Sequence, residues 1–224
     1  RSSKLPIHTL YGGANLFKKT TPKKLGKLAL EHFETYASNS YEFAQALELS
    51  SYISKFRTPK NVDAKNLAAE GQALSLDWLA ETVYQRVLKK LSTEPIEDQR
   101  LDFEDGYGSR SNKEEDKHAI SSAIEVACGA REGTLPPFIG IRIKSLSEET
   151  KRRSIRTLDL FLSAFADQKV PLPNPFLITL PKVTSVEHVS ALLKCIELLE
   201  AQCKFPKGHI KIELMIETIQ SITD

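Results

Sequence analysis

Strand-like and helix-like segments alternate at a nearly constant step over the second half of this 224-residue chain. The strand-like segments begin near Arg100, Phe138, Phe176 and His209, roughly 38, 38 and 33 residues apart. A step of this length holds one strand and the helix after it, and such alternation predicts a parallel sheet with right-handed crossovers. The intervening helices are expected over residues 113–130, 148–167 and 186–201.

These strand-like segments carry charged residues on one face. Isoleucine stands at every second position of residues 139–143, and Arg142 and Lys144 point to the opposite face, as Glu213 does in residues 210–216. A sheet covered by helices on both faces is normally aliphatic throughout. Because removing a charge from water costs several kcal/mol unless the charge is paired, charged faces on several strands indicate a polar interior.

We therefore predict an α/β fold, a (β/α)8 TIM barrel whose lumen is polar near its catalytic end. With a first strand over residues 6–10, five strands are predicted, so the chain is expected to be truncated after the fifth strand of the barrel. One partial barrel domain over 1–224 is expected, with a helical insertion over 12–98 and strand–helix units over 99–224. Within the insertion, helices are expected from Thr21 onward and over residues 41–49, 63–70 and 75–91.

Charge, hydropathy and cysteine spacing exclude several classes of protein. The net charge of +2 does not indicate a nucleic acid or an anionic membrane as partner, and the basic residues over 151–156 are expected to be a solvated helix face. No apolar run reaches the length of about 18 residues that a membrane span needs. The three cysteines lack CxxC spacing, and their odd number fits a reducing cytoplasm.

The residues that could carry chemistry stand at strand ends. In a TIM barrel the active site lies at the carboxyl ends of the strands. Tyr11 and His8, at the end of the first strand, would face the same mouth. The other candidates follow the later strands: Glu104, Asp105, Arg142, Lys144, Lys182 and Glu217.

Two of these residues suit a metal-assisted reaction. Glu217 offers the hard oxygen ligands that Mg²⁺ prefers, usually one or two carboxylates with substrate oxygens and waters. Arg142 offers a planar fork that matches a carboxylate. A divalent ion beside an arginine would polarise a 2-oxo acid and hold its enolate.

Structural roles are the alternatives for these two. An acid near a helix N-terminus stabilises the helix, so Glu217 could simply cap the helix that follows it. Arg142 could pair with Glu213 or Asp102 inside the barrel without contacting any substrate.

The remaining candidates also have alternatives. Lys144 and Lys182 could be solvated strand-end residues, and His8 could be a buried histidine with satisfied hydrogen bonds. The glycine-containing segment 106–110 lacks the spacing and the lysine of a nucleotide-binding P-loop.

Four segments, in order, resemble motifs of the citrate lyase beta-subunit and HpcH/HpaI aldolase family, within the pyruvate- and phosphoenolpyruvate-binding barrels. Residues 102–105 (DFED) resemble the acidic strand end "LEDA", and residues 140–143 (GIRI) resemble "VRVN". Residues 180–185 (LPKVTS) resemble "LPKVES", and residues 216–218 match "IET". The resemblance covers roughly residues 100 to 224.

The resemblance implies a barrel that forms trimers or hexamers. It also implies Mg²⁺ held by Glu217 and by an Asp of the next strand, beyond residue 224, with Arg142 on the oxo or carboxylate end of the substrate. Asp105 stands where the 2-oxo-acid aldolases have a histidine, which leaves the general base open, and Lys144 stands where asparagine is common. The long segment before residue 100 resembles a branch with some members labelled phosphoenolpyruvate kinase.

The leading hypothesis is a Mg²⁺-dependent carbon–carbon lyase of aldol or Claisen type, acting on a small 2-oxo acid or an acyl-CoA thioester. Arg142, Asp105 and Glu104 would be catalytic, and the truncated chain alone could be inactive. Alternatives are a phosphoenolpyruvate or pyruvate phosphotransferase, and a non-catalytic helical interaction module. The expected substrate contacts are Arg142, His8, Tyr11 and Lys182.

Overall fold

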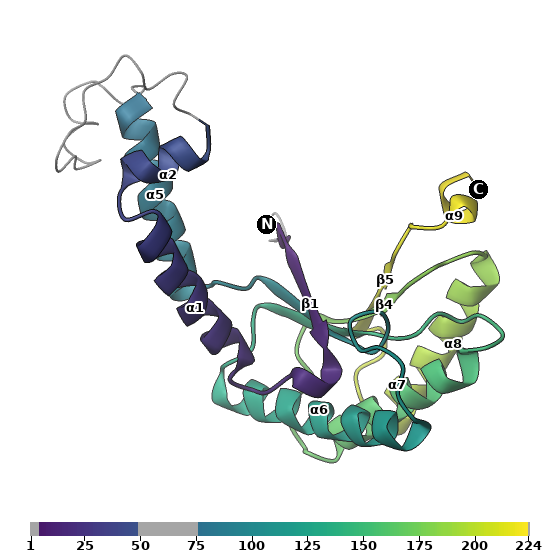
Figure 1. Cartoon of the computed structure of the whole chain (residues 1–224). Helices are drawn as coiled ribbons and strands as arrows, with labels where there is room; N and C mark the ends of the chain where they lie inside the picture. Colours follow the sequence, from purple (N-terminus) through teal and green to yellow (C-terminus); the bar gives the residue numbers. More distant parts are fainter. Residues whose placement is uncertain (1–4, 49–75, 224) are drawn as a thin grey trace. The chain divides into compact units, whose positions relative to one another are not determined.

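Five parallel strands form one sheet in the order β1-β2-β3-β4-β5 (Figure 1). The computed structural model describes residues 5–48 and 76–223. Between the strands run α6 (Asn112–Glu132), α7 (Lys151–Ala166) and α8 (Val186–Cys203), so the predicted α/β alternation and the parallel sheet are confirmed. The strands are β1 (Thr9–Gly13), β2 (Asp98–Asp102), β3 (Phe138–Arg142), β4 (Phe176–Leu180) and β5 (Ile210–Leu214).

The first helix of this region shows how local sequence sets the element ends. Ser111 accepts a hydrogen bond from the Glu114 amide, and the Glu114 side chain accepts one from the Ser111 amide, which is a capping box. Gly133 ends α6 in the left-handed conformation at φ 64°, which a residue without Cβ adopts at little cost. These signals place α6 within two residues of its predicted bounds.

The apolar face of the sheet packs against the helices. Figure 1 shows α6, α7 and α8 on the same side of the sheet. Phe176 of β4 stacks on Phe161 of α7 with ring centroids 5.8 Å apart. The isoleucines predicted to be apolar, Ile139, Ile141 and Ile143, are fully buried there. So are Leu101, Phe103 and Ile178 of the neighbouring strand segments.

The opposite face of the sheet is strongly concave. Tyr11 lies on β1 and Glu213 on β5, the two edge strands, yet the Tyr11 hydroxyl is 3.4 Å from a Glu213 carboxylate oxygen. In a flat sheet these strands would be roughly 19 Å apart, four inter-strand spacings. The sheet therefore curls around its polar face.

Residues 23–95 form a second compact unit, and residues 1–22 and 96–224 form the first. The second unit contains most of α1 (Thr21–Tyr36), with α2 (Ser40–Ala46) and α5 (Leu76–Thr93). The ring of Phe33 packs 4.9 Å from Phe43 and 5.3 Å from Tyr84, between centroids. The helix predicted over 63–70 lies outside the described residues, and the single-domain division with its 12–98 insertion stays a prediction.

Two details of the strands differ from expectation. β1 begins at Thr9, three residues after the start of the predicted 6–10 segment, because residues 6–8 do not pair with β2. The predicted apolar face of the fifth strand is buried only at its beginning, since Leu214 and Ile216 are 40% and 55% exposed. β5 is an edge strand of the described sheet, so no neighbouring strand covers them. None of the described helices has the length and apolarity needed to cross a membrane.

Candidate functional site

One row of side chains crosses the concave face of the sheet. The strand register pairs Gly13 with Asp102, Asp102 with Arg142, Arg142 with Thr179, and Thr179 with Glu213. Register partners in a sheet point to the same face. Polar groups from β2 to β5 therefore meet at one level, as the alternating charge pattern predicted.

Arg142 and Asp102 form a buried two-point ion pair. The Arg142 Nε and Nη2 atoms donate to the two Asp102 oxygens at 2.7 and 2.5 Å, and the Asp102 side chain is 0% exposed. Burial would raise the pKa of Asp102, but hydrogen bonds from Arg142 and from two backbone amides outweigh it and lower the pKa. Hydrogen bonding to Asp102 raises the pKa of Arg142 in turn.

The Arg142 fork is thus engaged by the protein, one of the two roles that the sequence left open. Its third nitrogen, Nη1, remains near the strand-end acids, 3.5 Å from Glu104 Oε2 and 4.0 Å from Asp105 Oδ2. The part of Arg142 that could still contact a substrate is this Nη1 edge.

Arg100 is a buried arginine that the sequence analysis missed. It is 0% exposed, it pairs with Asp98, and its Nε atom donates to the Thr179 hydroxyl at 2.9 Å. Its Nε and Nη2 atoms also donate to Glu213 at 3.1 and 3.2 Å. Asp98, Arg100 and Asp102 alternate along β2 on one face, a signal that was hidden because the strand was expected to begin near residue 100.

Tyr11 lies between the two arginine pairs. Its ring is 4.8 Å from the Arg142 guanidinium, a cation–π distance, and its hydroxyl donates to Glu213. Burial and then the Glu213 charge raise the pKa of Tyr11. The phenol therefore keeps its proton at neutral pH and can donate a hydrogen bond.

Lys182 joins the acids that follow β2 to the acid that follows β5. Its ammonium group contacts Glu104 and lies 3.0 Å from an Asp105 oxygen, while its backbone amide donates to Glu217 at 2.8 Å. The ion pair with Lys182 lowers the pKa of Asp105, and hydrogen bonding to Glu104 raises the pKa of Lys182. Lys182 adopts φ 48°, a left-handed conformation that is unusual for a side chain with Cβ.

Glu217 is exposed at this strand-end edge. The helix after it, α9 (Ile219–Thr223), is capped by Thr218, whose hydroxyl accepts from the Ser221 amide at 3.1 Å. Glu217 therefore does not take the capping role. Within residues 5–48 and 76–223, no three His, Cys, Asp or Glu side chains gather as a ready metal site.

His8 and Lys144 lie apart from this cluster. His8 precedes β1 and its side chain is exposed, so it is at the opposite end of the strand from the predicted mouth. Lys144 turns toward α6, where its Nζ atom is 2.9 Å from a Glu115 oxygen and 2.5 Å from the Phe103 carbonyl. The predicted substrate contact of His8 stays a prediction.

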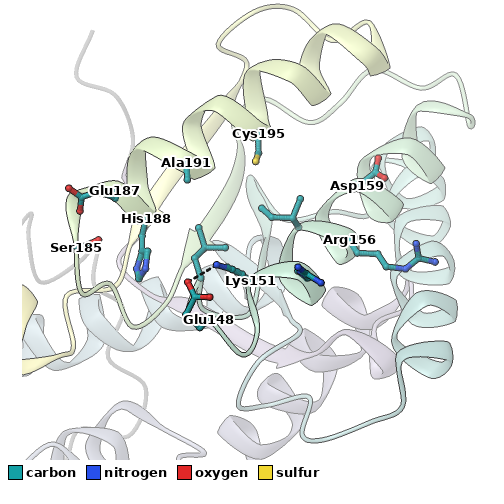
Figure 2. Close-up of a pocket in the computed structure, with 12 residues that line it drawn as sticks. Glu148, Lys151, Arg156, Asp159, Ser185, Glu187, His188, Ala191 and Cys195 are labelled. Carbon is teal, nitrogen blue, oxygen red and sulfur yellow. Dashed lines mark hydrogen bonds and ion pairs between the residues drawn. The ribbon is translucent and has the colours of Figure 1, made fainter.

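The first unit contains one cavity next to the cluster and another away from it. One, of about 500 Å³, is lined by Glu104, Asp105 and Lys144 and adjoins the cluster. The other, of about 830 Å³, lies along α7 and α8 and contains none of the predicted site residues. Figure 2 shows Lys151 paired with Glu148 at its mouth and His188, Ala191 and Cys195 along α8.

A family model described as "Domain of unknown function (DUF6986)" matches residues 1–224. The chain belongs to this family. No curated protein matches the DUF6986 chain. Among solved structures, a citrate lyase from Burkholderia xenovorans LB400 is similar at 22% identity and a TM-score of 0.45, over 62% of this chain and 38% of its own. The DUF6986 chain thus spans less than half of the length of that protein.

Proposed function

We propose that this chain carries the site of a carbon–carbon lyase of aldol or Claisen type, acting on a small 2-oxo acid or an acyl-CoA thioester. The observation that carries the proposal is the cluster at the carboxyl ends of β2, β3 and β4. There Arg142, held by Asp102, and Lys182 face the same two acids, Glu104 and Asp105.

The proposed fold is a TIM barrel that further strands would close. The curl that brings Tyr11 to Glu213 supports it, because an open twisted sheet would keep its edge strands apart. Exposed apolar residues next to the β5 edge also support it, since another strand–helix unit would cover them. They are Leu214, Ile216, Ile219 and Ile222, from 40% to 80% exposed.

The two strand-end cations would hold the substrate. Cleavage of the bond between the α and β carbons of a carbonyl compound leaves its electron pair in an enolate, and fixed positive groups stabilise the charge that develops on the enolate oxygen. Arg142 Nη1 and the Lys182 ammonium group are the donors at this edge. Glu104 and Asp105 would hold a water molecule or a substrate hydroxyl, and Tyr11 would contact the substrate from β1.

The charge balance of the cluster supports a bound cation. The cluster contains six carboxylates and three basic side chains, a formal excess of three negative charges that disfavours an anionic substrate alone. A divalent cation would offset this excess. The carboxylates are Asp98, Asp102, Glu104, Asp105, Glu213 and Glu217, and the basic residues are Arg100, Arg142 and Lys182.

Glu217 fits Mg²⁺ as one ligand, since it is an exposed hard-oxygen donor at this edge with one oxygen on the Lys182 amide. When bound, Mg²⁺ supplies a Lewis acid for the substrate oxygens. A trimeric or hexameric assembly and a cytoplasmic location stay predictions.

Turnover of candidate substrates by the full-length protein tests the proposal. Pyruvate or acetyl-CoA release is measured from a panel of hydroxy- and oxo-acids and their CoA thioesters, with Mg²⁺ and with EDTA. We expect Mg²⁺-dependent release that falls at least about 100-fold in Arg142→Lys and Glu217→Gln. Arg156→Lys is the matched control, because this surface arginine makes the same two-point contact with Asp116.

Two results would redirect the proposal. Unchanged turnover in both site variants would remove Arg142 and Glu217 from the site. Turnover of pyruvate or phosphoenolpyruvate that depends on ATP would favour the phosphotransferase alternative.

A further inference from the structure

Arg100 reaches further across the sheet than its strand position suggests. It lies on β2, but its guanidinium contacts Thr179 of β4 and Glu213 of β5. β3 separates these strands, so the side chain must cross it on the concave face.

Gly140 leaves the concave face of β3 without a side chain beside Arg100. It is the β3 residue in register with Arg100, and it has no side chain on the concave face. A glycine inside a strand is normally unfavourable and often marks a place where another group passes closely. Here the close group is the backbone of β4, since an added Cβ would lie 2.0 Å from the Leu177 carbonyl oxygen.

Arg100 is connected to Tyr11 through a shared partner, Glu213. Arg100 donates to both Glu213 oxygens, and Glu213 also accepts from Thr179 and from the Tyr11 hydroxyl. A carboxylate held by a two-point arginine contact has a defined orientation. The position of Glu213, and with it that of the Tyr11 phenol, depends on Arg100.

We propose that Arg100 is a positioning residue, which acts through Glu213 to place the Tyr11 hydroxyl at the site. The inference rests on the proposed function only in that Tyr11 contacts a substrate; its test needs no turnover. The charged and polar groups that face Tyr11 come from each of the other strands: Arg100, Arg142, Thr179 and Glu213.

Titration of the Tyr11 phenol tests the proposal. The full chain is labelled with 3-fluorotyrosine, and the ¹⁹F resonance of Tyr11 is assigned as the one that Tyr11→Phe removes. Glu213→Gln should lower the pKa of Tyr11 by about half a unit or more, because a nearby negative charge is lost. Arg100→Lys should raise it, because Glu213 loses its two-point partner and its charge acts more strongly on the phenol.

The Tyr11 pKa should shift in opposite directions in Glu213→Gln and Arg100→Lys, whereas a general disruption of the fold would not give opposite shifts. Arg156→Lys, on the surface pair with Asp116, should leave the Tyr11 titration unchanged. If Arg100→Lys does not fold, Thr179→Val should also raise the Tyr11 pKa, because it removes one donor to Glu213 and the Thr179 hydrogen bond that lowers the Tyr11 pKa directly.

Shifts of the same sign in Glu213→Gln and Arg100→Lys, or no shift relative to Arg156→Lys, would overturn the inference. Absence of lyase turnover together with the expected titrations would overturn the proposed function and leave the role of Arg100 standing.

Discussion

Two kinds of arginine–carboxylate pair can be compared within the first unit. Inside the curled sheet, Arg142 forms an ion pair with Asp102, and their side chains are 9% and 0% exposed, respectively. On the outer helices, Arg156 of α7 forms an ion pair with Asp116 of α6, and their side chains are 59% and 25% exposed, respectively. Both arginines make a two-point contact, and Asp116 is also paired with Arg153, but only the inner pair is shielded from water.

The difference teaches which ion pairs the fold depends on. A buried charge whose partner is removed has neither water nor a counter-ion, and the cost is several kcal/mol. An exposed charge simply returns to water, so a surface pair is worth at most about 1 kcal/mol. The inner pairs are also the ones that meet at the candidate site.

The largest effect is expected for Arg100→Met. It leaves Asp98 and Glu213 without their shared partner, and we expect a loss of about 3 to 5 kcal/mol in the free energy of unfolding. Urea unfolding followed by circular dichroism measures it. A loss below 1 kcal/mol would show that the inner pairs behave like the outer ones.

Gly140→Ala should come next. An added Cβ would lie 2.0 Å from the Leu177 carbonyl oxygen, a backbone atom of the neighbouring strand that cannot turn away. We expect a destabilisation of about 1 to 3 kcal/mol by thermal and urea unfolding. Gly12→Ala is the matched control, because nothing lies within 4 Å of its added Cβ. Equal stability of the two variants would contradict the tight packing of the concave face.

Acid should break the Asp102–Arg142 pair. The pKa of Asp102 is lowered in the folded protein, so its contribution to stability is present above the unfolded value of about 3.9 and is lost as the pH falls toward the folded value. Unfolding free energies from pH 7 to pH 3 should show this loss in the wild type and a smaller loss in Asp102→Asn. Parallel curves would refute the assignment.

Lys182→Met should alter the ionisation of Asp105 but have little effect on the free energy of unfolding, since Lys182 is partly exposed. The pKa of Asp105 should rise, because the ion pair with Lys182 is the main cause of its lowering. ¹³C NMR of the carboxyl resonance that Asp105→Asn removes measures the shift. Lys151→Met, which breaks the exposed pair with Glu148, should leave that resonance unchanged.

The smallest effect is expected for Arg156→Ala. The outer pair is screened by solvent, and its loss should change the free energy of unfolding by less than about 1 kcal/mol. A larger loss would mean that the α6–α7 contact relies on this arginine. Raising the salt concentration should shrink the difference further.

The site residues that follow the carboxyl ends of strands could largely be predicted from the sequence. Residues near the first positions of strands could not. Arg142 was expected at the polar face with Asp102 or Glu213 as a structural partner, and Asp102 is the one that it holds. Arg100 was missed because the start of β2 was placed two residues late. His8 was placed at the end of a strand that in fact begins after it. Strand starts lack the capping signals that mark helices, so their register is hard to read from one sequence.

The sequence by itself determined the order of strands and helices, the parallel sheet and the face on which the charges lie, because these follow from local periodicity. Only the tertiary structure decided which charges meet. Tyr11 and Glu213 are about 200 residues apart on opposite edges of the sheet, and they touch because the sheet curls. Curvature arises from the summed twist and packing of all five strands, and no local pattern of residues records it.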